Sequence, residues 1–215
     1  MPAMKLERPA TIALPEGGRA TGLALEGLYR PAHDTDRGGA VIAPPHPLYG
    51  GSMESPVVGE MAHGFERAGI ATLRFNWRGV GASAGEVSGD LAVGQEDYLA
   101  ALDFLADTLP PPLIASGYSF GAAAALAASA GPLVRRLVLV SPPPALLDRD
   151  RLADFHGKIL IATGAWDEVA PARELEGLEA PHAELELRVL EETDHFFMGG
   201  PGLRELAAAL VDWLG

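Results

Sequence analysis

The chain has 215 residues, a hydrophobic content of 48% and a formal net charge of −13. This length fits one globular domain with a sizeable core over residues 1–215, and the acidity argues against nucleic acid and anionic membrane surfaces as partners. The absence of cysteine excludes disulfides, thiolate catalysis and Cys-based metal sites.

Two apolar runs lie near the N-terminus, at residues 11–14 and 22–29, and they flank the turn-forming residues 15–18. This arrangement predicts an antiparallel hairpin. Short apolar strands then alternate with helical segments. Strands are expected at 39–43, 69–75, 136–140, 158–164 and 185–190, and helices at about 55–68, 95–109 and 203–214. A further strand, a tight turn and a helix are expected within 113–130. The alternation predicts an α/β fold, a mostly parallel sheet of about eight strands with helices on both faces.

One stretch, residues 113–126, has the pattern of an apolar strand, a tight turn and an Ala-rich helix. The turn is Gly117-Tyr118-Ser119-Phe120-Gly121, a Gly-x-Ser-x-Gly motif with Ser119 at its apex. Such a turn exposes the serine hydroxyl and points N–H groups at developing negative charge. We therefore expect Ser119 to be a nucleophile. The alternative is a glycine-flanked loop serine without a chemical role.

A serine hydroxyl needs a base to become nucleophilic, and functional residues of parallel α/β sheets gather where the strands end. His46 and His195 both follow an expected strand. Of these, His195 is the preferred base, because it lies beside aromatic residues in the loop before the last helix. The alternative is a solvent-exposed loop histidine. The other histidines are expected on a surface loop, on a flank or at the wrong end of the sheet: His33, His63, His156 and His182.

The base in turn needs an acid to orient it. Asp167 directly follows the strand at 158–164 and is the preferred candidate. Glu168 is a neighbouring carboxylate that would substitute for it, as would Asp194, although side chains adjacent in sequence usually point apart. Asp167 has a structural alternative as a helix N-cap. The order Ser119, Asp167, His195 is the one expected of an α/β-hydrolase triad.

These motifs resemble those of the α/β-hydrolase superfamily. Two further segments, Pro45-His46-Pro47-Leu48-Tyr49-Gly50-Gly51 and Phe75-Asn76-Trp77-Arg78-Gly79-Val80-Gly81-Ala82-Ser83, are similar to loops of a group of small bacterial members that lack a lid. The resemblance covers nearly the whole chain and implies the α/β-hydrolase fold. Only residues 141–157 separate two expected strands where lipases insert a lid, so we expect no cap domain and an open site.

The resemblance implies a role for each motif residue: Ser119 as nucleophile, His195 as general base and then acid, and Asp167 as its orienting group. The oxyanion hole would use the backbone N–H groups of Phe120 and Leu48. Pro47 has no N–H and cannot be the loop donor. The Tyr49 N–H is the alternative to that of Leu48.

Further residues are candidates for substrate contact. Arg78 is either a binder of substrate carboxylates or a structural arginine. The substrate-binding candidates are His46, Tyr49, Tyr118, Trp166 and Phe196.

The predicted function is a serine hydrolase that cleaves small soluble carboxylic esters through an acyl-enzyme. The same triad would serve a peptidase, thioesterase or acyltransferase, and a catalytically silent binding protein on this scaffold is the alternative of another class. No metal or organic cofactor is expected. Residues 1–9 contain no apolar signal segment, and no run is long enough to span a bilayer, so we expect a cytoplasmic location. The expected oligomeric state is a monomer or a homodimer.

Overall fold

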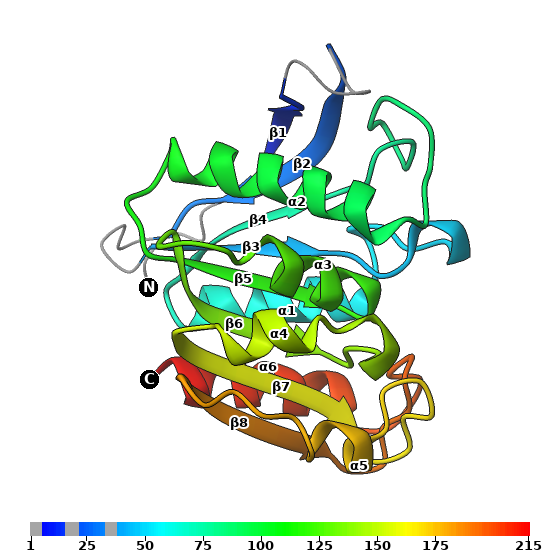
Figure 1. Ribbon diagram of the computed structural model, residues 1–215. Helices are drawn as coiled ribbons and strands as arrows, with labels where there is room; N and C mark the ends of the chain where they lie inside the picture. The colour runs from blue at the N-terminus through cyan, green and yellow to red at the C-terminus, as the bar shows by residue number, and fades with distance from the viewer. Residues whose placement is uncertain (1–5, 16–21, 33–37) are drawn as a thin grey trace.

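An eight-stranded sheet forms the centre of the protein, with strand order β1-β2-β4-β3-β5-β6-β7-β8 (Figure 1). The computed structural model describes residues 6–15, 22–32 and 38–215. The strands are β1 (Arg8–Ala13), β2 (Ala24–Arg30), β3 (Gly39–Ala43), β4 (Ala71–Phe75), β5 (Leu113–Tyr118), β6 (Val134–Val140), β7 (Gly157–Gly164) and β8 (Ala183–Leu190). The β1–β2 and β2–β4 pairs are antiparallel and the other pairs are parallel. The predicted mostly parallel sheet is therefore confirmed. Residues 16–18 of the predicted hairpin turn lie outside the described part.

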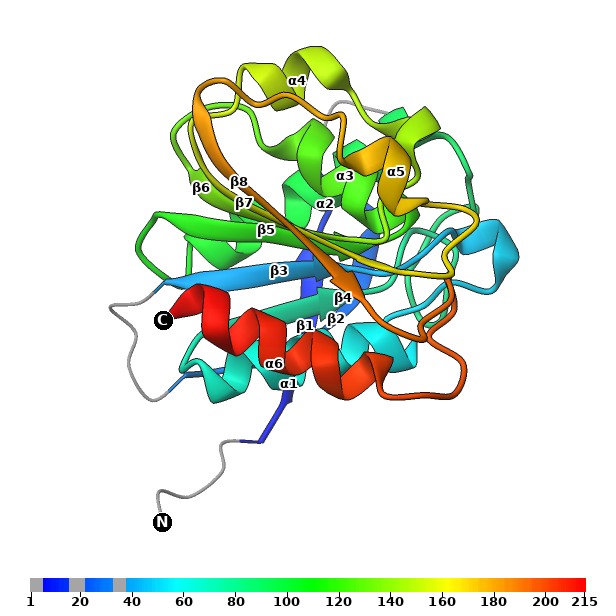
Figure 2. The same ribbon diagram turned by 90° about the horizontal axis from the view of Figure 1, so that it is seen from below.

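Helices cover both faces of this sheet, as the alternation predicted. Helices α1 (Pro56–Arg67) and α6 (Gly202–Leu214) lie side by side on one face, and α2 (Leu91–Ala106) and α3 (Phe120–Ala128) cover the other (Figure 2). The central strands are apolar on both sides because each face meets a helix layer: β3 and β5 are buried throughout. In the described ranges, no helix has the length and apolar character that crossing a membrane requires.

The loops at the carboxyl ends of the strands hold only short helices. Residues 141–156 fold into a 3-10 turn, η2 (Pro144–Leu146), and one short helix, α4 (Arg149–Ala153), so no cap domain is inserted there. Helix α5 (Ala172–Leu175) was not predicted, since four residues carry no periodic signal. Helix α2 begins before the predicted residue 95, because Asp90 caps it by accepting from the Ala92 N–H at 2.9 Å.

A buried ion pair attaches the loop after β4 to α2. The Nε of Arg78 donates to Asp97 Oδ1 at 2.8 Å and its backbone N–H donates to Oδ2 at 3.0 Å. Burial raises the pKa of Asp97 and the bonds from Arg78 oppose that rise, so the buried carboxylate depends on its partner. Of the two interpretations of Arg78, the structural one fits this geometry, since its carboxylate partner belongs to the protein itself.

Replacing the buried Asp97 carboxylate should destabilise the folded protein. Asp97→Asn is expected to lower the free energy of unfolding by about 3–5 kcal/mol, because it leaves the buried Arg78 charge with only the exposed Glu96 carboxylate as a partner. Urea denaturation followed by tryptophan fluorescence measures the loss. Glu96→Gln is the matched control: Glu96 also pairs with Arg78, at 3.0 Å, but its side chain is 60% exposed. It should cost less than about 1 kcal/mol. Equal losses of unfolding free energy in the two variants would contradict the conclusion that Asp97 is the partner on which the buried Arg78 depends.

Candidate active site

The turn between β5 and α3 places Ser119 in a strained backbone conformation, with φ 55° and ψ −117°. Two glycines allow this turn to pack closely. A Cβ at Gly117 would lie 2.3 Å from the Gly121 carbonyl carbon, and a Cβ at Gly121 would lie 2.5 Å from the Ala43 carbonyl oxygen. The motif spacing thus has a steric cause: both positions touch backbone, and a side chain at either would push α3 away from the sheet.

Three side chains from three loops form a hydrogen-bonded chain at this turn. His195 Nε2 lies 3.1 Å from Ser119 Oγ, and His195 Nδ1 lies 3.0 Å and 2.9 Å from the two carboxylate oxygens of Asp167. The His195 side chain is 9% exposed, whereas the Asp167 side chain is fully enclosed. The acid is therefore shielded from water, while Ser119 and His195 are buried but retain a small exposed area.

The loop after β7 holds Asp167 as an ionised acceptor. Its Oδ1 accepts from the backbone N–H groups of Val169, at 2.9 Å, and Ala170, at 2.7 Å. Burial by itself would raise the pKa of Asp167, but the hydrogen bonds from His195 and Ala170 outweigh it, so the pKa is lowered. The carboxylate therefore stays charged and fixed in orientation. The alternative of a helix N-cap is wrong: α5 has Pro171 as its N-cap, and the two N–H groups that Asp167 accepts from belong to the turn before that helix.

Tyr118 has a different environment from the one expected of a substrate contact. It is buried, and its hydroxyl donates to the His195 carbonyl oxygen at 2.6 Å. Burial, with smaller contributions from Asp167 and Asp194, raises the pKa of Tyr118, so the hydroxyl remains a donor. This contact gives Tyr118 a structural role in place of the expected substrate contact: its side chain holds the loop that carries His195. Sequence reasoning missed this contact, which joins residues 77 positions apart.

Backbone strain is concentrated at the same edge of the sheet. In the described ranges, the non-glycine residues with positive φ are Ser119, Ser141, Glu192 and Phe197. Each lies in a loop that follows the carboxyl end of β5, β6 or β8. Residues held in this region cost of order 1–3 kcal/mol each and persist where surrounding contacts determine them. The strain therefore coincides with the loops that carry the serine and the histidine.

The loop after β3 is folded around His46. This residue caps the 3-10 turn η1 (Pro47–Tyr49): its Nδ1 accepts from the Leu48 N–H at 3.2 Å and its carbonyl oxygen accepts from the Tyr49 N–H at 3.1 Å. Its ring packs against those of Tyr49 and Phe120, at 4.7 and 4.8 Å between centroids. Burial lowers the pKa of His46. Both expected loop donors are thus bonded to His46.

A hydrogen-bond network explains the second loop motif, residues 75–83. Asn76 Oδ1 accepts from the Met53 N–H at 2.8 Å, and Asn76 Nδ2 donates to Glu26 at 2.8 Å. Trp77 Nε1 donates to the Pro45 carbonyl oxygen at 3.0 Å. These bonds attach the loop after β4 to both ends of the loop that contains His46. The motif therefore has a structural role, which is to brace the neighbouring loop.

The remaining substrate-contact candidates lie at the surface around this site. Tyr49 is 87% exposed, Trp166 63% and Phe196 67%. The Phe196 ring meets that of His195 edge to face, at 5.4 Å between centroids. The backbone N–H of Trp166 donates to the Thr193 carbonyl oxygen at 2.9 Å, so the loops after β7 and β8 are joined. All three aromatic side chains are exposed and lie in loops at the same edge of the sheet as Ser119.

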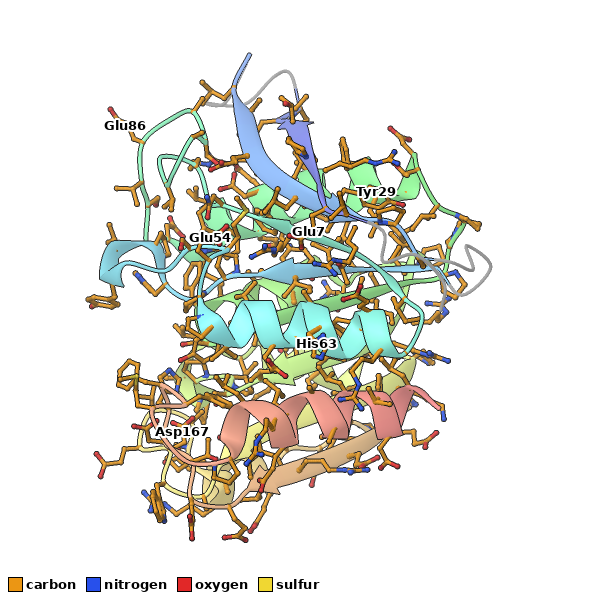
Figure 3. The ribbon with its side chains drawn as sticks, turned by 180° about the vertical axis from the view of Figure 1, so that it is seen from behind. Glu7, Tyr29, Glu54, His63, Glu86 and Asp167 are labelled. Atoms are coloured by element: carbon orange, nitrogen blue, oxygen red, sulfur yellow. The ribbon has the colours of Figure 1, made fainter. Side chains whose placement is uncertain are left out.

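The competing histidines and carboxylates lie elsewhere or are engaged differently. His63 projects from the outer face of α1, away from Asp167 (Figure 3). His156 and His182 stack on each other, at 4.9 Å between centroids, before β7 and β8. Asp194 Oδ1 accepts from the Phe196 N–H at 3.1 Å and so stabilises the histidine loop. His33 lies outside the described residues. Among the part described, no group of three His, Asp or Glu side chains is arranged to hold a metal ion.

Comparisons with known proteins agree with this architecture. The model of the alpha/beta hydrolase family matches residues 49–213. The uncharacterized protein RP471 of Rickettsia prowazekii is 31% identical over 203 residues, which covers 88% of this chain and 84% of that protein. An α/β serine hydrolase homologue from Coxiella burnetii is 28% identical, with a TM-score of 0.81 and 97% of each chain covered. XC6422 from Xanthomonas campestris, a serine hydrolase without lid, is 28% identical, with a TM-score of 0.76 over 95% of this chain and 91% of that one. The chain belongs to the α/β-hydrolase family.

Proposed function

We propose that the protein is a serine hydrolase that cleaves small carboxylic esters through an acyl-enzyme. The observation that carries the proposal is the hydrogen-bonded chain from Ser119 through His195 to Asp167, built on a strained turn at the carboxyl edge of the sheet. A nucleophile, a base within hydrogen-bond reach and a group that orients the base are the parts that acyl transfer requires.

In the first half of the reaction, Ser119 Oγ attacks the ester carbonyl carbon while His195 Nε2 takes the hydroxyl proton. Asp167 fixes the imidazole with Nδ1 protonated and stabilises the positive charge that forms on it. The tetrahedral intermediate then collapses, the bond to the leaving oxygen breaks, and His195 donates its proton to the departing alcohol. In the second half, His195 activates a water molecule, which attacks the acyl-enzyme and releases the acid and Ser119.

The oxyanion hole in this proposal consists of the Phe120 and Leu48 N–H groups. Phe120 is the first residue of α3, where N–H groups have no partner within the helix. The Leu48 N–H donates to His46 Nδ1 at 3.2 Å, and in the reaction it would exchange that side-chain acceptor for the oxyanion. Removal of one such donor typically costs about 2.7–4 kcal/mol of transition-state stabilisation.

Labelling with a fluorophosphonate tests the activated serine directly. The protein is expected to gain one phosphonyl adduct, on the peptide that contains Ser119, because only a serine beside a general base reacts readily. Intact-mass measurement and peptide mapping give the readout. Absence of an adduct at Ser119 would overturn the proposal and favour a silent hydrolase scaffold. A substrate panel of p-nitrophenyl butyrate, a thioester and an amide then separates esterase activity from thioesterase and peptidase activity.

A further inference from the structure

Exposed aromatic rings are concentrated around Ser119. The chain has seven Phe, four Tyr and three Trp residues, all in the described part, and only Tyr49, Trp166 and Phe196 are exposed. They come from the loops after β3, β7 and β8. Trp166 also lines a hollow of about 680 Å³ beside the loop after β7, whose charged lining residues are Asp167, Glu168 and Arg173. Large rings left in water at one site mark a surface that contacts an apolar ligand.

The loops at this edge of the sheet carry more acidic than basic side chains. Segments 44–55, 76–90, 165–171 and 191–201 follow β3, β4, β7 and β8, and together they hold eight carboxylates and one cation, Arg78, whose charge is paired with Asp97 and Glu96. Glu54 and Glu86 lie toward the same edge of the molecule as Asp167 (Figure 3). Several of these groups are also exposed, including Glu168 and Glu192. An anion that approaches Ser119 therefore meets apolar rings interspersed with like charge.

We propose that this mouth selects esters whose acyl group is apolar and uncharged, and that it discriminates against esters whose acyl group carries a carboxylate. The inference rests on the proposed function, since it assigns a substrate class to the same site. The three rings supply apolar surface for the acyl chain, and like charges placed opposite one another disfavour the anionic substrate. Because these carboxylates are exposed, salt screens the repulsion.

Two substrates of equal length test the charge selection: the p-nitrophenyl ester of hexanoic acid and the p-nitrophenyl monoester of adipic acid, which differ in a terminal methyl or carboxylate group. At low ionic strength kcat/KM for the hexanoate should exceed that for the adipate by about tenfold or more, and the ratio should narrow at high ionic strength. Glu168→Gln should reduce the ratio. The control Glu179→Gln removes an exposed charge before β8, at the opposite edge, and should leave it unchanged.

Acyl chain length tests the apolar surface. From acetate to hexanoate, kcat/KM should rise, by up to about fourfold for each methylene that is fully buried. Trp166→Ala and Phe196→Ala should flatten this rise, whereas Leu99→Ala, which removes an exposed apolar side chain from α2, should not.

Two results would overturn the inference while leaving the function intact: Ser119-dependent hydrolysis of both esters at equal rates in low salt, or faster hydrolysis of the adipate. Absence of Ser119-dependent hydrolysis of either ester would instead overturn the proposed function, and the substrate class with it. The Ser119→Ala protein, assayed beside the wild type, distinguishes these failures.

Discussion

Ser119→Ala is expected to lower kcat for p-nitrophenyl butyrate hydrolysis by a factor of about 10⁴–10⁶, with little change in KM. The side chain that forms the acyl-enzyme is absent, and only the oxyanion donors and substrate binding remain. The fold should persist, because alanine tolerates the positive φ of this turn about as well as serine does and the glycines that allow close packing are untouched.

Ser129→Ala is the matched control for this variant. Ser129 lies at the other end of α3, and its hydroxyl donates to the Leu126 carbonyl oxygen at 2.7 Å. Its loss should cost stability of about 1 kcal/mol and leave kcat unchanged. Urea denaturation shows whether either variant has lost structure. A folded Ser119→Ala protein with wild-type turnover would exclude the proposed mechanism.

Asp167→Asn should lower kcat by a factor of about 10³–10⁴ with little change in KM. An asparagine at this position retains the shape and the acceptor for the Val169 and Ala170 N–H groups. It removes the charge that stabilises the imidazolium and allows His195 to adopt the wrong tautomer. Steady-state kinetics at one pH measure the effect.

Asp154→Asn serves as the control for a lost carboxylate. Asp154 is exposed at the end of α4 and takes no part in the chain that leads to Ser119. Its turnover should match the wild type. If Asp167→Asn were equally active, the acid would have to be another residue, and Asp194 would be the next to test because it lies beside His195 in the same loop.

A loss of stability at low pH should also trace to Asp167. Its pKa is lowered in the folded protein, so the stability it contributes is present above the unfolded-state pKa and is lost as the pH falls through the folded-state value. The wild type should therefore lose stability in acid more steeply than Asp167→Asn. Urea midpoints measured across the acidic range give this comparison.

Much of the fold could be predicted because its determinants are local. The apolar runs of β3 to β7 and the periodic pattern of α1, α2 and α6 each depend on a few consecutive residues, and their alternation selects a parallel sheet. Boundaries were less accurate where a capping residue decided them, as at Asp90. Short helices such as α5 gave no periodic signal. The rule that strand ends meet at one edge also made Ser119, Asp167 and His195 candidates for one site.

The partners of individual side chains depended on the tertiary structure, because they join residues far apart in the chain. Arg78 could be named as structural or ligand-binding, but its pairing with Asp97 follows from the packing of α2. Tyr118 could be placed next to the nucleophile, but its bond to the His195 carbonyl oxygen depends on where the loop after β8 lies.

By itself, then, the sequence determined the order of elements, the glycine-flanked turn at Ser119 and the set of polar residues at the strand ends, since each follows from local spacing. Only the tertiary structure decided that His195, and none of the other described histidines, hydrogen-bonds to Ser119, and that Asp167 rather than Glu168 meets its Nδ1. The physical reason is that a hydrogen bond depends on distance and direction in space, and the course of β7 and β8 across the sheet sets both.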